Sequence, residues 1–486
     1  MLLTTNPINT SVADVVILGA GPAGLACAAT LGACGYRGRV SVLDCGRIYT
    51  RRPCPVDQHR ECHGCGGVCN VIAGFGGAMH YGDGVKLSKF PSGRRLSEVL
   101  GADRADRIMS EAIGLLLGGA VPDFSSPLVE TSVGDLKRYP VASLSSADVR
   151  SMITRLDAII RNVGTIDLHL NTRAVNIERA EGRFVVHATT SSERSHVFKS
   201  ATVVVATGRR GFLWWRKQLR DLGIVFTPPS PSIGFRFDCP KELLVGPSAC
   251  HPDFKTTIYR NGFKFKTFCF CAGPGGGRIK FTDYGPFTLL DGHTVVEEEN
   301  PLPSANFALL AQLRHSNGSP WTFEEIDSTV IAPYVSLNPE RPGKPIIQSY
   351  SDFKNSTLSC GTLERLAQQT GRELYLRDLR FANIATLLSV DLHRAYCEVL
   401  DELLERFTEL SYPGVRPSQW QKFIARTAVM ALELEGLWDE VAVDGNMRTS
   451  IDGLFVIGDC AGIAQGILQG ATAGVQAAHA ICDGQV

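Results

Sequence analysis

The chain has 486 residues, of which 44% are hydrophobic and 20% are charged. This length is enough for about three domains, and the composition excludes a disulfide-stapled miniprotein, a collagen-like chain and a largely disordered one. The 49 basic residues balance the 49 acidic residues, so no global charge favours nucleic acid or an anionic membrane, and a small-molecule ligand fits better.

The start of the chain and its cysteines bear on location. Residues 1–13 are polar and lack the regions of a secretory signal. The 15 cysteines are scattered from Cys27 to Cys482, and together these features predict a reducing, cytoplasmic location. The uncharged stretch 15–36 is long enough to span a bilayer, but glycines and Pro22 interrupt it, which argues against a membrane span.

The first motif has the pattern of a dinucleotide-binding turn. The aliphatic run 14–18 predicts a buried parallel strand, residues 19–24 spell G-x-G-x-x-G, and the small residues 25–31 predict a helix. These glycines make the turn, let the backbone approach a pyrophosphate and let the helix close on the strand. A second strand, 39–44, ends in an acid that suits a ribose diol. The expected cofactor contacts here are Gly19, Gly21, Pro22, Ala23, Gly24, Asp44 and Cys45.

Four cysteines follow with the spacing C-x7-C-x2-C-x3-C: Cys54, Cys62, Cys65 and Cys69. Four thiolates in such a loop suit zinc or an iron–sulfur cluster. Alternatively, Cys62 and Cys65 suit a dithiol that exchanges electrons, and free thiols in a tight loop are the third interpretation. All three stay open at this point.

The next segment, 74–84, holds five glycines. Backbone this bare can lie flat against a planar ring and donate N–H groups to it, so Gly76 and Gly77 are expected at the cofactor. An ordinary loop is the competing interpretation. The candidate catalytic side chains, as proton donors or charge partners, are His80, Asp83 and Lys86.

Further along the chain, an amphipathic helix is predicted over 146–161, with Ser146 as its cap. A hairpin is predicted over 171–187 and a buried strand over 201–208.

A last buried strand, within 453–462, runs into a helix of small residues over 466–481. With the opening turn, this late strand resembles the two-dinucleotide-binding-domain flavoproteins, the glutathione-reductase-like superfamily. The resemblance implies FAD as the cofactor, with Asp459 at its ribityl and pyrophosphate part and the last helix directed at the flavin pyrimidine edge. It also implies that the hairpin lies beside the adenine; a plain surface hairpin is the alternative. The implied contacts are Ala174, Thr207, Gly208, Gly458, Asp459, Gly466 and Ile467.

The cysteine-rich turn and the segment 74–87 are similar, more closely, to an uncharacterised family of FAD-dependent dehydrogenases. Three later pieces also match, at 208–211, 267–273 and 306–308. Met79, Gly82 and Val85 depart from the pattern of that family. The resemblance implies a fold and a cofactor but no substrate.

The segment 263–271 alternates like a strand. On a regular strand, Cys269 and Cys271 would share a face roughly 6.5 Å apart, which argues against a disulfide between them. Burial in a core is favoured over a place in a substrate pocket.

Residues 1–223 and 440–486 are expected to form a Rossmann-like α/β FAD-binding domain, a parallel sheet with helices and a hairpin insert. Residues 224–439 are expected to form an inserted mixed α+β substrate domain. A dedicated NADPH fold is not expected, because Arg278 stands where 273–278 would need a glycine, but NAD(P)H stays open as a transient reductant.

The expected function is hydride transfer between a small organic substrate and flavin N5. The alternatives are a thiol-linked flavin electron-transfer protein that uses the four-cysteine segment, and a flavin-bearing RNA-associated or regulatory protein.

Overall fold

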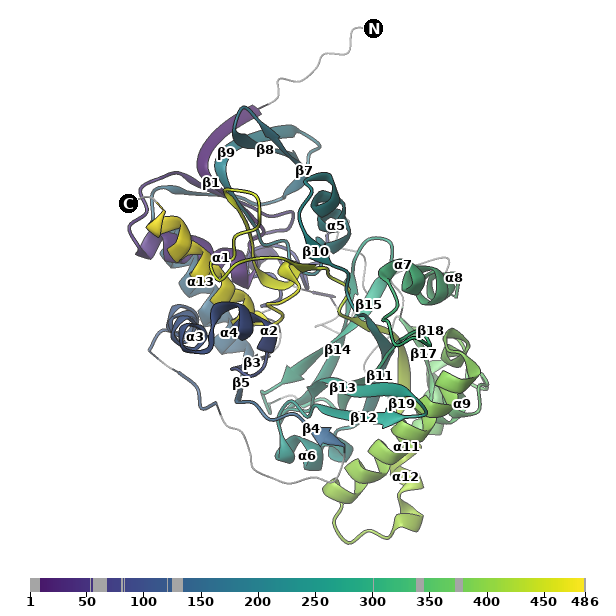
Figure 1. The fold of residues 1–486 in the computed structure, drawn as a ribbon. Helices are drawn as coiled ribbons and strands as arrows, with labels where there is room; N and C mark the ends of the chain where they lie inside the picture. Colours follow the sequence, from purple (N-terminus) through teal and green to yellow (C-terminus); the bar gives the residue numbers. More distant parts are fainter. Residues whose placement is uncertain are drawn as a thin grey trace.

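The structure is a computed structural model, and two large β-sheets organise it (Figure 1). It describes residues 9–52, 54–55, 68–79, 82, 84–119, 121–124, 134–299, 301–337, 345–371 and 379–484.

The first sheet is parallel except for an antiparallel hairpin at one edge. Its order is β6-β2-β1-β9-β8-β7, and β21 pairs in parallel with β9. The strands are β1 (Asn9–Leu18), β2 (Val40–Leu43), β6 (Ile166–His169), β7 (Thr172–Ala180), β8 (Arg183–Thr190), β9 (Ser195–Val205) and β21 (Leu454–Val456). The central strands end in fully buried aliphatic runs because helices cover the sheet. This arrangement confirms the predicted Rossmann-like FAD-binding domain with its hairpin.

Small residues let the two main helices of this domain pack closely. Helices α1 (Pro22–Ala33) and α13 (Ile467–Asp483) lie side by side (Figure 1). A Cβ on Gly474 would lie 2.2 Å from the Ala23 carbonyl oxygen, so this approach requires glycine. The surrounding elements are η1 (Tyr49–Arg51), β3 (Val85–Ser88), α2 (Arg94–Leu100), α3 (Ala102–Leu117), β5 (Val141–Leu144), α4 (Ser146–Arg161) and α5 (Phe212–Asp221).

Helix α4 has the predicted bounds but not the predicted cap. Ser145, not Ser146, is its N-cap: the Ser145 side chain accepts the N–H of Asp148, and Asp148 returns the bond to Ser145. This reciprocal capping box needs the serine three residues before the acid, which only Ser145 satisfies.

The second sheet is mostly antiparallel, with the order β18-β17-β19-β11-β16-β13-β12-β4. Its strands are β4 (Asp135–Leu136), β11 (Ser232–Pro240), β12 (Thr256–Arg260), β13 (Phe263–Cys271), β16 (Ser304–Gln312), β17 (Ile346–Ser349), β18 (Arg380–Phe381) and β19 (Ala428–Glu435). Helices α6 (Lys241–Cys250) and α11 (Val390–Ser411) pack on it over a core rich in aromatic rings. This is the predicted inserted domain of mixed α and β structure.

Shorter elements complete the described residues. They are β10 (Phe226–Thr227), β14 (Gly276–Asp283), β15 (Thr288–Val295), α7 (Phe323–Ile326), η4 (Asp327–Ile331), α8 (Ala332–Ser336), α9 (Tyr350–Lys354), α10 (Leu363–Thr370), η5 (Ile384–Leu387), η6 (Pro417–Gln419), α12 (Gln421–Ile424), β20 (Glu440–Val441) and η7 (Gly458–Ala461).

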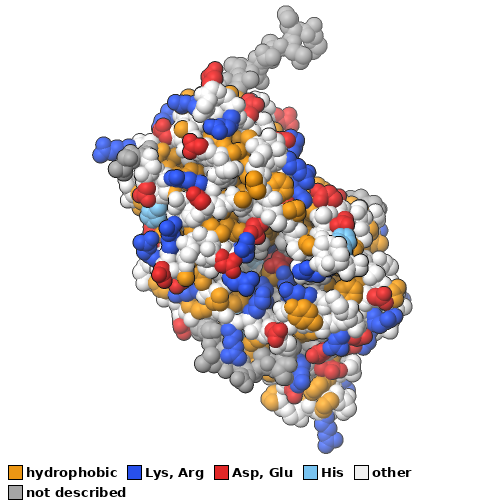
Figure 2. Space-filling model, viewed as in Figure 1, with side chains coloured by type: hydrophobic (Ala, Val, Ile, Leu, Met, Phe, Trp, Pro, Cys, Tyr) orange, Lys and Arg blue, Asp and Glu red, His pale blue; other side chains and the backbone are white. Residues whose placement is uncertain are grey.

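Two of the places where the chain passes between the sheets lie together. Strand β10 leads out of the first domain, β20 leads back, and the two pair as an antiparallel ribbon. The domain limits placed after 223 and 439 stay predictions. On the face shown in Figure 2, Lys and Arg side chains gather beside a hollow near the middle of the molecule. Within the described ranges, no helix combines the length and apolar character needed to cross a bilayer.

Candidate functional site

Glycine sets the spacing between β1, β9 and α1 at the end of the first sheet. A Cβ on Gly24 would lie 1.9 Å from the Gly19 carbonyl oxygen, and one on Gly19 would lie 2.2 Å from the Ala206 oxygen. Gly19 also has a φ of +115°, which L-residues rarely adopt. The turn is therefore closed by backbone alone.

The glycine-rich loop after Cys69 lies on this turn. The N–H of Gly76 donates to the Ala20 carbonyl at 2.8 Å, and a Cβ on Gly77 would lie 2.7 Å from the Gly21 Cα. Both loop glycines have positive φ. The loop therefore brings bare backbone against the first turn, and we call residues 19–24, Gly76, Gly77 and Gly458 the glycine cradle.

Arg52, which the sequence analysis did not single out, holds this loop in place through hydrogen bonds to its carbonyl groups. Its side chain is 1% exposed, and its guanidinium donates to the carbonyls of Phe75 and Gly77, both at 2.6 Å. An arginine that follows a second arginine, Arg51, at the start of a cysteine-rich segment carries no sequence signal for such a role.

Asp44 joins three backbone segments beside the cradle. Its carboxylate accepts the N–H groups of Ala20 at 2.8 Å, Gly46 at 2.7 Å and Gly74 at 2.8 Å. A carboxylate has about four acceptor positions, so one remains for a further donor such as a ribose hydroxyl. Burial raises the pKa of the adjacent Cys45 to about 11, which keeps this thiol protonated at neutral pH.

The hairpin begins next to Asp44. The N–H of Thr172 donates to the Asp44 carbonyl at 2.8 Å, and that of Asn171 donates to the Gly46 carbonyl at 2.8 Å. Ala174 follows on β7, with its side chain packed at the edge of the domain core.

The end of the chain returns to the opening turn. A Cβ on Gly458 would lie 3.0 Å from the Ala23 Cβ, so the segment after β21 touches the first turn of α1. The Asp459 carboxylate accepts from Arg209 Nε at 3.0 Å and from the Gly466 N–H at 3.4 Å. Burial lowers the pKa of Arg209, but Asp459 and other carboxylates outweigh it, and the pKa lies well above its ordinary value.

The remaining predicted contacts lie around this return. Thr207 and Gly208 follow β9 directly, and a Cβ on Gly211 would lie 2.4 Å from the Thr207 side chain. Ile467 is the first residue of α13, and Pro22 is the first residue of α1.

Helices α1 and α13 both begin here at a glycine. Their N-cap residues are Gly21 and Gly466, and neither helix has a side-chain cap hydrogen bond. Among the residues that the structure describes, a Cβ on Gly21 would meet only the Gly77 Cα within 4 Å, at 3.9 Å. The uncapped start of α1, framed by bare backbone, suits a pyrophosphate. The residues present therefore fit a dinucleotide such as FAD.

Of the candidate catalytic residues, Lys86 belongs to β3, whereas His80 and Asp83 lie outside the described residues. The Lys86 ammonium pairs with Asp253 at 2.5 Å and donates to the Phe270 carbonyl. Burial lowers the pKa of Lys86, but Asp253 outweighs burial and holds the pKa above its ordinary value. Lys86 is therefore a fixed cation rather than a proton donor or base.

Cys269 and Cys271 lie next to this lysine, at an irregularity of β13. The register of the strand shifts between Phe268 and Cys271, Cys269 has a φ of +48°, and the two Sγ atoms are 3.6 Å apart. The unbroken alternation expected over 263–271 is therefore wrong at this end of the strand, and both thiols are free. The expected burial holds for Cys271 alone, since Cys269 is partly exposed.

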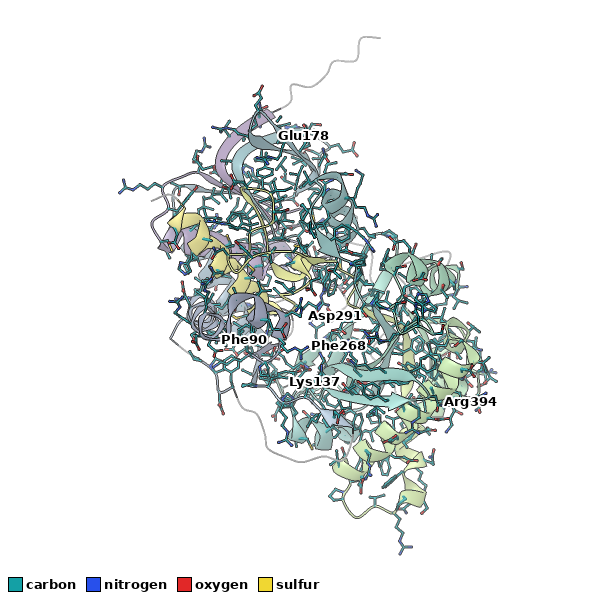
Figure 3. The ribbon with its side chains drawn as sticks, in the orientation of Figure 1. Phe90, Lys137, Glu178, Phe268, Asp291 and Arg394 are labelled. Carbon is teal, nitrogen blue, oxygen red and sulfur yellow. The ribbon has the colours of Figure 1, made fainter. Side chains whose placement is uncertain are left out.

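A buried ion pair adjoins the two thiols. Arg236, which is fully buried, donates to Glu433 at 2.9 and 3.0 Å and to Asn306 Oδ1 at 2.6 Å. It also donates to the Cys269 carbonyl at 3.3 Å. We call Cys269, Cys271, Lys86 and Arg236, with their partners Asp253 and Glu433, the thiol centre. In Figure 3, Phe268 and Asp291 lie on the side of the inserted domain that faces the FAD-binding domain.

Sequence reasoning missed Arg236, Glu433 and Asp253. One signal was available: charged residues interrupt two mostly apolar strands, with Arg236 and Asp238 in β11 and Glu433 and Glu435 in β19. A charge in such a position requires a buried partner.

The four-cysteine segment is only partly described. Cys54 and Cys69 are buried, and Cys62 and Cys65 lie outside the described residues. In the described part of the chain, no group of three or more His, Cys, Asp or Glu is placed to hold a metal ion. The interpretations of this segment stay predictions.

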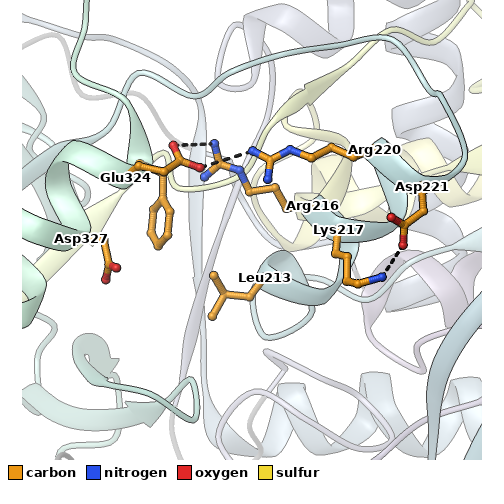
Figure 4. A pocket seen from close by; sticks show the side chains of 8 residues that line it. Leu213, Arg216, Lys217, Arg220, Asp221, Glu324 and Asp327 are labelled. Carbon is orange, nitrogen blue, oxygen red and sulfur yellow. Dashed lines mark hydrogen bonds and ion pairs between the residues drawn. The ribbon is translucent and has the colours of Figure 1, made fainter.

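A separate pocket of about 290 Å³ lies between α5 and α7 (Figure 4). Most of its charged side chains pair with one another: Lys217 with Asp221 at 2.5 Å, Arg220 with Glu324 at 3.3 Å, and Arg216 with Glu324 at 3.5 Å. Because these charges are mutually balanced, we assign no ligand to this pocket.

Comparison with known families supports the interpretation of the glycine cradle as a dinucleotide-binding site. Residues 13–214 match a family model described as pyridine nucleotide-disulphide oxidoreductase. The match includes the opening turn, the hairpin and β9. A comparison with curated proteins finds no matching sequence.

Solved structures show low similarity. A geranylgeranyl bacteriochlorophyll reductase-like protein from Thermoplasma acidophilum is 12% identical, over 98% of this chain and 79% of its own, with a TM-score of 0.42. A flavoprotein/dehydrogenase from Cytophaga hutchinsonii is 11% identical, over 96% and 76%, with a TM-score of 0.37. Aklavinone-11 hydroxylase, solved with FAD and aklavinone, is 14% identical, over 94% and 58%, with a TM-score of 0.35. Because these TM-scores are below 0.5, the three structures add nothing to the functional assignment.

The family match and the glycine cradle define the protein as an FAD-dependent oxidoreductase with a dinucleotide-binding fold. Its placement among the glutathione-reductase-like flavoproteins, and in the family of FAD-dependent dehydrogenases, stays a prediction.

Proposed function

We propose that this enzyme transfers a hydride between a small organic substrate and N5 of FAD held in the glycine cradle. The observation that carries the proposal is the contact of Gly458 with Ala23. That contact joins the late strand to the opening turn, and an enzyme that held only a mononucleotide would not need both.

In this proposal, the first N–H groups of α1 hold the pyrophosphate, and Asp44 accepts a ribose hydroxyl through its remaining acceptor position. Gly76 and Gly77 leave room for a planar ring, because neither carries a side chain. Asp459 and the start of α13 face the ribityl chain and the ring edge. When bound, FAD supplies the hydride acceptor or donor.

Arg209 has a positioning role in this arrangement. Its ion pair with Asp459 fixes the carboxylate next to Gly466, at the uncapped start of α13. An unpaired carboxylate at that place would repel the phosphates of the cofactor. Arg209 therefore makes Asp459 compatible with an anionic ligand.

The small substrate is proposed to enter from the side of the inserted domain. Phe268 and Asp291 lie on the part of this domain that faces the FAD-binding domain, and Lys137 follows β4 of the same sheet as Phe268 (Figure 3). NAD(P)H remains a candidate for the transient reductant.

The test begins with the purified full-length protein. We expect a yellow preparation that releases FAD on heating, as identified by chromatography, and that is bleached anaerobically by one of a panel of small reductants. A folded preparation that is colourless and does not take up added FAD would contradict the proposal.

A further inference from the structure

Basic residues mark the face of the second sheet that points away from α11. On β13, Phe265 is buried, and its ring lies 5.6 Å from that of Tyr396 in α11. Because side chains alternate along a strand, Lys264, Lys266 and Phe268 share the opposite face, and all three are partly exposed. In Figure 3, Phe268 lies on the side of the inserted domain that faces the FAD-binding domain. The two lysines of β13 therefore lie on that same side.

Two further lysines join them from neighbouring segments. Lys255 immediately precedes β12, and the N–H of Lys137 donates to the Lys255 carbonyl at 2.8 Å. The ammonium groups of Lys255 and Lys266 lie 5.1 and 6.0 Å from the centre of the Phe268 ring. We call the four residues Lys137, Lys255, Lys264 and Lys266 the lysine group.

Neighbouring acids neutralise only part of the charge of the lysine group. Glu435 pairs with Lys266, Asp135 is exposed on β4, and Asp253 already pairs with Lys86. Four lysines against Glu435 and Asp135 leave two formal positive charges. Partial burial lowers the pKa of Lys137, and the charges of the other three lysines lower it further. A bound anion would relieve this repulsion.

A series of charges connects the lysine group to the glycine cradle. Burial raises the pKa of Glu435, but Lys266 and Arg209 are among the cations that outweigh burial and hold the pKa at about 2. Arg209 also pairs with Asp459 at 3.0 Å, beside the start of α13. The charge of Asp291 acts on Arg209 as well and raises its pKa. The lysine group therefore adjoins the part of the cradle that the proposed function gives to the flavin.

We propose that the lysine group binds an acidic group of the substrate, so that the substrate is a small organic anion. This inference rests on the proposed function, because it names the class of molecule that exchanges a hydride with FAD. Ammonium groups are flexible point charges that bind carboxylates and phosphates alike, so the class includes both. The Phe268 ring beside the ammonium groups suits an apolar body on the same molecule.

The experiment measures the binding of simple probes to the purified full-length protein by ligand-observed NMR titration. Benzoate and phenyl phosphate carry the two kinds of anion on a ring, benzylamine carries a cation, and benzyl alcohol is uncharged. We expect one of the anions to bind at least roughly ten times more tightly than benzylamine or benzyl alcohol, and to bind more weakly as salt is added. The anion that binds more tightly identifies the acidic group as a carboxylate or a phosphate.

Substitutions then place this binding at the lysine group. Lys137→Gln and Lys255→Gln should each weaken the preferred anion roughly fivefold, as expected when one charge about 4 Å away is removed. The double variant with glutamate at both positions should weaken it at least roughly 25-fold. Lys199→Gln, which removes an exposed lysine of β9 in the other domain, is the matched control and should bind like the wild type.

A measurement on the wild type guards against misfolding of the variants. After acetylation with acetic anhydride, cleavage at arginine yields the peptides 108–138 and 195–209, whose single lysines are Lys137 and Lys199. A bound anion favours the charged form of a nearby lysine, and that form is not acetylated. The preferred anion should therefore slow the labelling of Lys137 at least roughly threefold and leave Lys199 unchanged.

Several results would overturn the inference. They are equal binding of the uncharged or cationic probe, unchanged anion binding in the lysine variants, and equal protection of Lys137 and Lys199. A labelled RNA that bound more tightly than either anion, and weakened in the same variants, would assign the lysine group to a polymer and also overturn it.

These readouts do not need flavin, so the two proposals fail separately. A yellow, reducible protein that does not prefer the anions would contradict this inference and leave the proposed function intact. A colourless protein that takes up no FAD but binds the anion through the lysine group would contradict the proposed function and leave the anion site.

Discussion

In the glycine cradle, Gly19 and Gly24 close the turn with no side chain between β1 and α1. In the thiol centre, by contrast, Lys86 and Arg236 surround two cysteines with buried charge, and each cation has a carboxylate partner. Gly19 and Gly24 therefore tolerate no added side chain, whereas the thiol centre is destabilised when one charge of an ion pair is removed. Substitutions of the two kinds should have different signatures.

The largest effect is expected for Gly24→Val. The new side chain would begin 1.9 Å from the Gly19 carbonyl oxygen, which is backbone and cannot move aside. We expect the variant to purify without FAD and to lose about 3 kcal/mol of unfolding free energy through overpacking. Visible absorbance of the purified protein and urea unfolding measure the two effects.

A matched control for this change is Gly114→Ala. Gly114 lies within α3, and an added Cβ would meet nothing within 4 Å. This variant should keep its FAD and its stability. If Gly24→Val also kept FAD, the cradle would not be the cofactor site.

The next largest effect is expected for Arg236→Met, which leaves Glu433 buried without its cation. Breaking a buried ion pair in this way costs roughly 3–5 kcal/mol. Unfolding in urea should show this loss, and FAD should remain bound, because Arg236 lies in the inserted domain. Replacing both residues by Met should restore most of the stability, and a double variant as weak as the single one would show that the charge was not the cause.

The same contrast explains what could be predicted from the sequence. The cradle follows local rules, since each glycine of 19–24 has a mechanical task at a fixed spacing. The strands and helices around it were predicted from the sequence, although β1 and β9 begin five and six residues before the predicted starts at 14 and 201. Most residues of the thiol centre lie on four strands, β3, β11, β13 and β19. No local pattern in the sequence predicts that these strands lie close together. The bulge in β13 was also invisible, because the segment alternates regularly in its letters.

A smaller effect, with a pH signature, is expected for Asp253→Asn. Burial raises the pKa of Asp253, but Lys86 outweighs burial and holds the pKa at about 2, below its ordinary value of 3.8. A carboxylate with a depressed pKa stabilises the fold above its unfolded pKa, and this stabilisation is lost as the pH falls toward 2. The variant should therefore lose about 2 kcal/mol at pH 7.

The difference between Asp253→Asn and the wild type should shrink between pH 4 and pH 2, as measured by thermal unfolding across this range. Asp167→Asn provides the comparison, because Asp167 forms an exposed ion pair with Arg39. That variant should change the stability by less than about 1 kcal/mol. A deficit of Asp253→Asn that stayed constant down to pH 2 would contradict the assigned ion pair.

The smallest effect concerns the helix that lies over the cradle. Ile153 of α4 packs against Gly76, where an added Cβ would lie 3.2 Å from the Ile153 Cδ1. Ser145→Ala removes the N-cap of this helix and should cost about 1 kcal/mol. FAD affinity should not change, because the cap lies two turns from Ile153 and the cradle is held by backbone contacts. Ser146→Ala should have almost no effect on stability, since Ser146 is not the cap. A loss of FAD in Ser145→Ala would show instead that the cradle depends on the helix above it.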